Sequence, residues 1–480
     1  MSTFDLADIK SKSVKGVVAL TARTFTLQII GFIATFFLTL LLTPSIFGVY
    51  YVVSAVISFL GYFSDIGLAA ALVQKKEDLT PEDIQTTFTI QQLLVGTAVI
   101  IALLGSVKIG EFYGLNPSGV WLFRALVLSF FLSSLKTIPS ILMERSLAFD
   151  RLIIPTIVET LGFYIVAVLL AFNGMGIASF SWAVLCRGIL GVIAVYIVEP
   201  WTPSFGISKD VAKRLLRFGV PFQMNSFLAL VKDDLLTVFL GKALPFAEVG
   251  YIGWAKKWAE VPLRLIMDSV IRVTFPAFSR IQHDKKLLGK ALEKTIYGLS
   301  LTIFPISVAL MFLVRPLVFL IPKYVKWEPA LVSFYFFVGA AAIAGLTTPL
   351  TNALNAIGKI KTTLFLMGMW TTLTWVLTVL FIRLFGYQGV AVSIFLITFT
   401  IGIVVKEMQR VVPFNFLKNI GSAVLASFVQ AAWYAVILKI VPSSFIILIP
   451  VGVLGVILYA GCVFLIDRSR LVAFMRSLKS

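Results

Sequence analysis

The stretch EVGYIGWAKKWAEVPLRLIMDSVIRVTFPAFSR, residues 248–280, sets a ladder of charges among apolar side chains. Its rungs are four residues apart and alternate in sign: Lys256, Glu260, Arg264, Asp268 and Arg272. A four-residue step on an α-helix advances about 40° beyond one turn, so neighbouring rungs stay within reach of each other. A charged side chain at the bilayer centre costs about 2.5–3.5 kcal/mol, and an intrahelical pair returns only about 0.2–0.5 kcal/mol. We therefore expect a membrane helix whose charged band faces a wet cavity or other charged helices.

The composition indicates an all-α polytopic membrane protein. Of the 480 residues, 59% are hydrophobic and only 13% are charged, against about 45–50% and roughly 25% in soluble domains. The only cysteines and histidine are Cys186, Cys462 and His283, which makes a disulfide framework or a metal site improbable. No phosphate-binding loop or nucleophile motif is present, so we expect no cofactor and no enzymatic activity, and transport driven by a gradient.

A span of about 20 apolar residues crosses a bilayer, and on that basis we predict about fourteen transmembrane helices. They cover residues 17–42, 47–73, 85–107, 120–142, 152–172, 176–198, 218–240, 247–274, 295–321, 330–355, 362–382, 388–405, 419–440 and 445–466.

The basic residues between these spans predict the orientation. If the N-terminus is cytoplasmic, 25 Lys and Arg residues fall on the cytoplasmic side and six on the other. This asymmetry follows the positive-inside rule and accounts for the net charge of +18 without nucleic-acid binding. We expect a multi-pass protein of the inner (cytoplasmic) membrane with both termini in the cytoplasm.

An internal repeat divides the chain. Three short patterns recur in the same order at offsets of 202, 210 and 213 residues, the first pairing Gly48 with Gly250. Six spans per copy is an even number, so the two copies should be related by a pseudo-two-fold axis along the membrane normal. The predicted parts are a first lobe (1–200), a basic amphipathic linker helix at the cytoplasmic surface (201–217), a second lobe (218–410), and two extra helices with a tail (411–480).

Ionisable residues inside the spans are the candidate site residues, ten basic and six acidic. This excess of positive charge suits an anionic group. The cations proposed to bind substrate are Arg23, Arg264, Lys256, Arg272, Lys232, Arg124 and Arg187. The carboxylates proposed for ion coupling or gating are Asp65, Asp233, Asp234, Glu260, Asp268 and Glu159. Lys136 and Arg315 can instead reach an interface.

Arg264 is the strongest candidate for a phosphate contact, because a guanidinium matches phosphate oxygens bidentately and stays charged. The alternative role for Arg264 is an intrahelical brace to Glu260 or Asp268.

Several motifs resemble one known family. They are LTPSIFGVY (42–50), FSDIGLAAALVQ (63–74), LLRFGVPFQMNS (215–226), VGYIGWAKKWAEVPLRLI (249–266) and VTFPAFSRIQHD (273–284). The chain resembles the multidrug/oligosaccharidyl-lipid/polysaccharide exporter superfamily, in its branch of Wzx-type polysaccharide flippases. The resemblance implies two six-helix lobes around a central cavity, alternating access, and basic residues on the first and eighth helices, here Arg23 and Arg264. The two extra helices resemble those of lipid II flippases, which hold a prenyl tail.

The expected function is translocation of a polyprenyl-diphosphate-linked oligosaccharide (an O-antigen, capsule or exopolysaccharide unit) from the inner to the outer leaflet. Coupling to H+ or Na+ and contact with membrane lipids and a polysaccharide polymerase or assembly machinery are further expectations. Three alternatives stay open: a lipid II flippase, a drug/cation antiporter of the same superfamily, and a scaffold of a polysaccharide-assembly complex.

Overall fold

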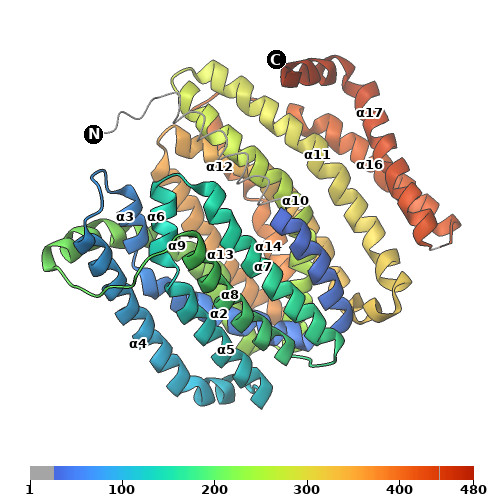
Figure 1. The fold of residues 1–480 in the computed structure, drawn as a ribbon. Coiled ribbons are helices and arrows are strands. Elements are labelled where there is room, and N and C mark those ends of the chain that lie inside the picture. The colour runs from blue at the N-terminus through green and yellow to red at the C-terminus, as the bar shows by residue number, and fades with distance from the viewer. Residues whose placement is uncertain (1–25, 443, 480) are drawn as a thin grey trace. The chain divides into compact units, whose positions relative to one another are not determined.

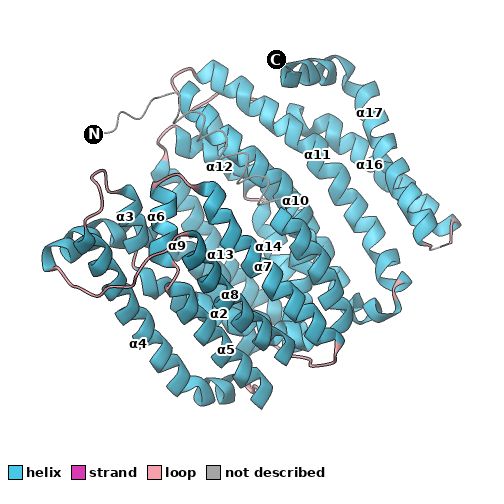
Figure 2. Ribbon diagram, viewed as in Figure 1, coloured by secondary structure: helices cyan, strands magenta, loops and turns pink. Residues whose placement is uncertain are grey.

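The computed structural model describes residues 26–442 and 444–479. Throughout that part of the chain the regular structure is helical and no strand is present (Figures 1 and 2). The all-helical prediction is confirmed. The chain folds into two compact units that divide between Gly250 and Tyr251, and each is described by itself. The predicted lobe boundaries, which rest on the repeat, stay a prediction.

The first unit begins, in its described part, with the helix Thr26–Leu41. Eight further helices and the first turn of α10 follow it: α2 (Pro44–Asp65), α3 (Leu68–Gln74), α4 (Pro81–Tyr113), α5 (Pro117–Ser134), α6 (Thr137–Arg145), α7 (Phe149–Phe172), α8 (Ala178–Val198) and α9 (Lys209–Ala243).

The second unit holds the remainder of α10 (Phe246–Ile281) and the helices that follow it. These are α11 (Lys285–Leu320), the 3-10 helix η1 (Pro322–Ala330), α12 (Leu331–Ala356), α13 (Ile360–Phe385), α14 (Gln388–Thr398), α15 (Ile401–Gln409), α16 (Phe416–Ile440) and α17 (Phe445–Lys479).

Each of the fourteen predicted spans corresponds to helix in the described structure. Eleven segments are long and apolar enough to cross a membrane, and the helix Thr26–Leu41 is apolar but shorter. The other two predicted spans are α9 and α10, which carry the charged sequences discussed above. The protein is therefore a multi-pass membrane protein, and the count of fourteen crossings stays a prediction.

Three predicted spans are interrupted, which the apolar pattern did not indicate. The span 47–73 breaks where Ile66 and Gly67 take left-handed backbone angles (φ 48° and 76°). The span 120–142 breaks between α5 and α6, and the span 388–405 breaks between α14 and α15. Irregular backbone at membrane depth is tolerated only where protein or a wet cavity surrounds it, so these breaks are places to look for polar function.

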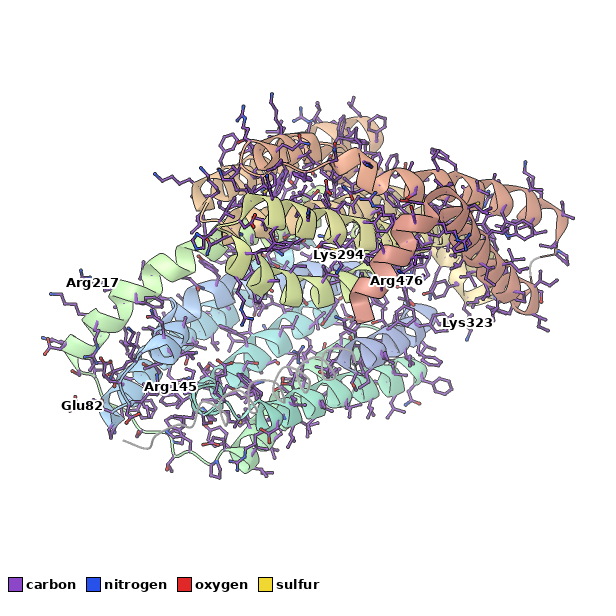
Figure 3. The ribbon with its side chains drawn as sticks, turned by 90° about the horizontal axis from the view of Figure 1, so that it is seen from above. Glu82, Arg145, Arg217, Lys294, Lys323 and Arg476 are labelled. Carbon is purple, nitrogen blue, oxygen red and sulfur yellow. The ribbon has the colours of Figure 1, made fainter. Side chains whose placement is uncertain are left out.

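A buried carboxylate ties the start of α9 to α4. Asp83, fully buried in the first turn of α4, accepts hydrogen bonds from the backbone and hydroxyl of Thr80 (2.9 Å each), from Lys75, and from Arg214 at 2.7 Å. Figure 3 labels three more charged residues at this end of the unit, Glu82, Arg145 and Arg217. Because removing one partner of a buried pair leaves an uncompensated charge, this network fixes α9 to the first unit.

The prediction of a linker helix over residues 201–217 is wrong for its first half. Helix begins only at Lys209, as the first turn of the 35-residue α9. Proline and glycine interrupt the preceding segment, and its backbone bonds elsewhere, since the N–H of Gly206 donates to the hydroxyl of Thr89 on α4 (3.0 Å). The segment is therefore held against α4 by polar bonds.

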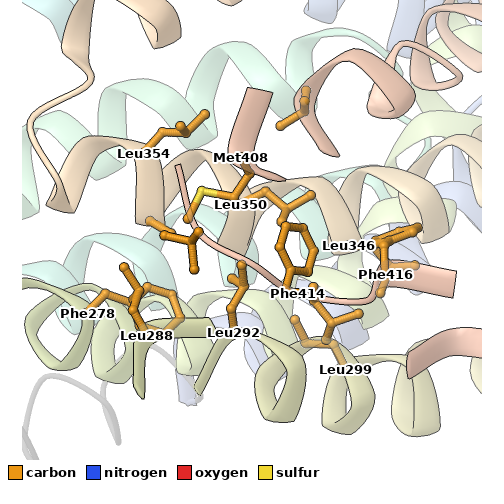
Figure 4. Close-up of a cluster of buried hydrophobic side chains, with 14 of the residues drawn as sticks. Phe278, Leu288, Leu292, Leu299, Leu346, Leu350, Leu354, Met408, Phe414 and Phe416 are labelled. Atoms are coloured by element: carbon orange, nitrogen blue, oxygen red, sulfur yellow. The ribbon is translucent and has the colours of Figure 1, made fainter. Parts of the chain in front are cut away.

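The core of the second unit is apolar and fixes α10 within that unit (Figure 4). Rows of buried side chains four residues apart meet in it: Leu288, Leu292 and Ile296 from α11, and Leu346, Leu350 and Leu354 from α12. Leu263 of α10 is 2% exposed and belongs to the same cluster. Arg264 is about 100° around the helix from Leu263, and its side chain is exposed.

Candidate functional site

A cluster of opposite charges lies inside the first unit, where α7 packs against α8 and the break between α5 and α6 lies beside α7. Glu159 of α7 accepts a hydrogen bond from Lys136 at 2.5 Å, and its second oxygen is 3.7 Å from Nε of Arg187 on α8. The Lys136 and Glu159 side chains are 14% and 12% exposed, whereas the Arg187 side chain is 53% exposed. We call these three residues the Arg187 cluster. It carries one net positive charge and presents a half-exposed guanidinium.

Lys136 lies in the break between α5 and α6, and this break positions its side chain next to Glu159. Polar side chains from two neighbouring helices satisfy the break: the hydroxyl of Tyr196 on α8 donates to the carbonyl of Leu135 (3.1 Å), and the amide of Gln91 on α4 donates to the hydroxyl of Thr137 (2.8 Å). Interrupted helices of this kind supply binding sites near the midplane of many transporters. Here the interruption places an ammonium group beside the Glu159 carboxylate.

Two glycines of α8 create the space that the cluster occupies. A Cβ at Gly188 would be 2.9 Å from Leu132 of α5, and a Cβ at Gly191 would be 2.3 Å from Oε1 of Glu159. Small residues let membrane helices approach closely. The close approach of α8 brings Arg187 and Glu159 within reach of each other.

The cluster is deep in the helices that carry it. Arg187 is nine residues into the 21-residue α8, and Glu159 is ten residues into the 24-residue α7, which places both about 14–15 Å from the helix starts at 1.5 Å per residue. Ile189 and Ile193 are 49% and 51% exposed and lie about 120–160° around α8 from Arg187 at 100° per residue. Arg187 is therefore on a different face from these lipid-compatible side chains.

Two phenols lie near the guanidinium. The charge of Arg187 acts on the phenols of Tyr50 on α2 and Tyr164 on α7, and Tyr164 also hydrogen bonds Thr35 of the first described helix. The ring of Tyr50 stacks on Phe180 of α8 with centroids 4.3 Å apart. Tyr50 and Tyr164 therefore add hydroxyl groups in the neighbourhood of Arg187.

The structure places the other predicted site residues as follows. Arg264 donates to Glu260 at 2.8 Å, with the two side chains 63% and 28% exposed, so the intrahelical brace is present. Lys232 and Asp233 form a long ion pair of 4.0 Å. Arg124 donates to the hydroxyl of Ser106 at 2.9 Å. The remaining two described side chains are half-buried, Asp234 and Lys256.

Four predicted residues cannot be placed in this way. Arg23 lies outside the described residues, and nothing is described of the side chains of Asp65, Asp268 and Arg272. Among the described candidates, Arg187 and Glu159 form an ion pair between two helices, α8 and α7. Sequence reasoning assigned Lys136 to an interface and did not single out Tyr50 or Tyr164. The polar residues Ser133 and Ser134, close before Lys136 in an apolar span, were the available signal for Lys136.

Two apolar grooves open on the described surface. One, of about 460 Å³, lies between α11 and α17 and is lined by residues that include Leu313, Leu317, Leu448, Gly452 and Val456. The other, of about 540 Å³, lies between α7 and α8 and is lined by residues that include Val166, Leu170, Trp182 and Cys186. Both fit hydrocarbon rather than a polar ligand. Within the described residues, no three His, Cys, Asp or Glu side chains gather as a metal site would require.

The fold is that of the multidrug/oligosaccharidyl-lipid/polysaccharide transporters. A lipid II flippase MurJ in an inward closed conformation superposes with a TM-score of 0.73 over 94% of this chain and 99% of its own, at 14% identity. An inward-facing multidrug resistance MATE transporter reaches 0.59 over 85% and 98%, at 16% identity. At such identities the likeness establishes the fold alone.

The chain belongs to the polysaccharide biosynthesis protein family, which residues 37–330 match. Its relatives include the succinoglycan biosynthesis transport protein ExoT of Rhizobium meliloti (24% identity, 59% of this chain and 57% of ExoT). They also include the lipopolysaccharide biosynthesis protein WzxC of Escherichia coli (24%, 63% and 62%). An uncharacterised membrane protein in the cps region of Klebsiella pneumoniae matches at 23% over 74% and 73%. The chain thus spans between about half and three quarters of these relatives.

Proposed function

We propose that this protein is a flippase that carries a polyprenyl-diphosphate-linked oligosaccharide from the inner to the outer leaflet by alternating access. The observation that carries the proposal is the half-exposed guanidinium of Arg187, about 14 Å deep in α8 and away from its isoleucine face. A cation held there is costly unless it serves a polar path. The family and the named transport relatives support a polysaccharide cargo.

The Arg187 cluster suits a diphosphate because it is preorganised but incompletely neutralised. Glu159 holds Arg187 by a contact of 3.7 Å, longer than the roughly 2.7–2.9 Å of a strong charge-assisted hydrogen bond. A diphosphate can therefore bind the Arg187 guanidinium through two hydrogen bonds, while the positive charge of Lys136 still neutralises the Glu159 carboxylate. The nearby phenols of Tyr50 and Tyr164 offer donors to phosphate or sugar oxygens. The exposed Arg264 of α10 and Arg23 are proposed as further cations along the path.

The lipid part of the cargo needs an apolar surface while its head crosses. The groove between α11 and α17 provides one, lined by aliphatic side chains and Gly452. Because α17 is the last of the predicted spans, this location agrees with the expectation that the two extra helices hold a prenyl tail. We propose that the tail rests there during translocation.

Two other cargoes are the alternatives. A lipid II flippase would use the same diphosphate chemistry, so complementation of a strain lacking its own lipid II flippase separates it from our proposal. A drug/cation antiporter needs an acidic site, whereas the Arg187 cluster has two cations for one carboxylate. The charge of the site therefore favours an anionic cargo.

The remaining expectations complete the proposal. The charge distribution supports a cytoplasmic location for both termini, and an H+ or Na+ gradient is the proposed energy source. A polysaccharide polymerase would receive the cargo outside. The function is tested with purified protein in liposomes that contain a polyprenyl-diphosphate saccharide in the outer leaflet, under an imposed ion gradient. We expect flipping to protect the saccharide, so that a smaller fraction of it is accessible to an enzyme added outside than in protein-free liposomes. No protein-dependent movement of any such saccharide would refute the proposal.

A further inference from the structure

The first turns of α2 and α10 cross with their backbones in contact. A Cβ at Gly48 of α2 would be 1.8 Å from the carbonyl oxygen of Phe246, and a Cβ at Gly250 of α10 would be 2.0 Å from the carbonyl oxygen of Pro44. Real Cβ atoms essentially never come within 3.0 Å of such atoms. All four residues belong to the first unit. Only hydrogen in place of a side chain permits this crossing.

The crossing is reciprocal. In each helix the glycine contacts the residue that stands four positions before the partner glycine, namely Pro44 before Gly48 and Phe246 before Gly250. Contacts of this form, in which i meets j and j meets i, arise at a two-fold axis. Gly48 and Gly250 are also the pair that the sequence repeat matched at an offset of 202. The contact between the first turns of α2 and α10 therefore has local two-fold symmetry.

The opposite end of α2 is closed by a second contact, this time with α9. A Cβ at Gly67 would be 2.2 Å from the carbonyl oxygen of Gly219, and a Cβ at Gly219 would be 2.6 Å from that of Ile66. One turn further in, the hydroxyl of Tyr62 donates to the carbonyl of Gln223, whose side-chain amide donates back to the carbonyl of Tyr62 at 3.1 Å. Both ends of α2 are thus sealed by glycine-dependent contacts.

We propose that α2 carries a gate at each end, and that glycine at positions 48 and 250 is what allows the gate at the Pro44 end to close. In the proposed orientation, with both termini in the cytoplasm, this gate lies at the outer side. A helix that must separate from its neighbour and return needs a contact without interlocked side chains, and bare backbone provides it. Between the gates, Val52 is fully buried against Gly241 of α9, where a Cβ would be 2.4 Å from the valine side chain. Val52 therefore reports on opening.

The test uses a cysteine at position 52 in a chain whose two native cysteines are replaced, Cys186→Ala and Cys462→Ala. The protein is purified in nanodiscs and reacted with a bulky hydrophilic maleimide. Val52→Cys alone should react slowly. Adding Gly48→Ala should accelerate labelling by about tenfold or more, because a Cβ against an immovable carbonyl disfavours the closed form. The matched control is Gly96→Ala in α4, where a Cβ meets nothing within 4 Å.

Equal labelling with Gly48→Ala and with Gly96→Ala would overturn the proposal. If Gly48→Ala does not yield folded protein, Gly250→Ala places the same bulk on the other helix and decides by the same comparison. The labelling rate does not depend on the cargo. A negative labelling result would therefore overturn the gate and not the proposed function, and a negative transport result would overturn the proposed function and not the gate.

Discussion

The carboxylate of Glu159 occupies the space that a side chain at position 191 would need, because a Cβ at Gly191 would be 2.3 Å from its Oε1. This close fit is what aims the carboxylate between Lys136 and Arg187. The glycine on α8 therefore belongs to the site although it has no polar group.

Gly191→Ala should displace the carboxylate and weaken both ion pairs. Overpacking of this kind costs about 1–3 kcal/mol, so the midpoint of thermal unfolding should fall and transport should fall with it. Intrinsic tryptophan fluorescence on heating gives the midpoint. Gly96→Ala, where the added methyl group meets no neighbour, should leave both quantities unchanged; an equal loss in the control would remove the explanation.

Glu159→Gln should destabilise the fold more than removal of the pair does. The single change leaves Lys136 buried without a counter-charge, which costs about 3–5 kcal/mol, whereas apolar replacement of both partners of a buried pair is often near neutral. We therefore expect Lys136→Met together with Glu159→Met to restore most of the stability. Thermal unfolding of Lys136→Met, Glu159→Met and the double variant checks this, and additive losses would contradict the coupling.

The Arg264–Glu260 pair should contribute little to stability, in contrast. Its arginine side chain is 63% exposed, and exposed pairs are typically worth about 0.2–1 kcal/mol. Glu260→Gln should leave unfolding nearly unchanged, whereas Arg264→Ala should lower transport if this cation contacts the cargo. Normal transport by Arg264→Ala would show that Arg264 does not contact the cargo and serves only as the intrahelical partner of Glu260.

Filling the groove between α11 and α17 should impair carriage of a long lipid tail. Val453 lines this groove and is 53% exposed, so Val453→Trp should slow a long-chain polyprenyl cargo more than a short-chain analogue. Ile446→Trp is the control, since Ile446 is 83% exposed on the same helix and is not among the lining residues. Equal slowing of both chain lengths would argue against a tail site.

The sequence predicted the helices well because burial in lipid demands long apolar runs, and these runs are visible residue by residue. It did not predict the break between α5 and α6, since neither Leu135 nor Lys136 is a proline or glycine and the carbonyl of Leu135 is satisfied by the distant side chain of Tyr196. It also could not rank the interior cations. Arg187 and Arg124 look alike in sequence, and only helix packing shows that one meets a carboxylate and the other a serine.

The most direct test of the central claim compares flipping by wild type, Arg187→Ala and Arg383→Ala in liposomes that carry a polyprenyl-diphosphate oligosaccharide. Arg383 is an exposed cation in the last turn of α13, so its loss removes the same charge away from the cluster. We expect Arg187→Ala to lose at least about tenfold in rate, since a charge-assisted contact is worth roughly 1.5–3 kcal/mol, with Arg383→Ala unchanged. Wild-type flipping by folded Arg187→Ala would contradict the account.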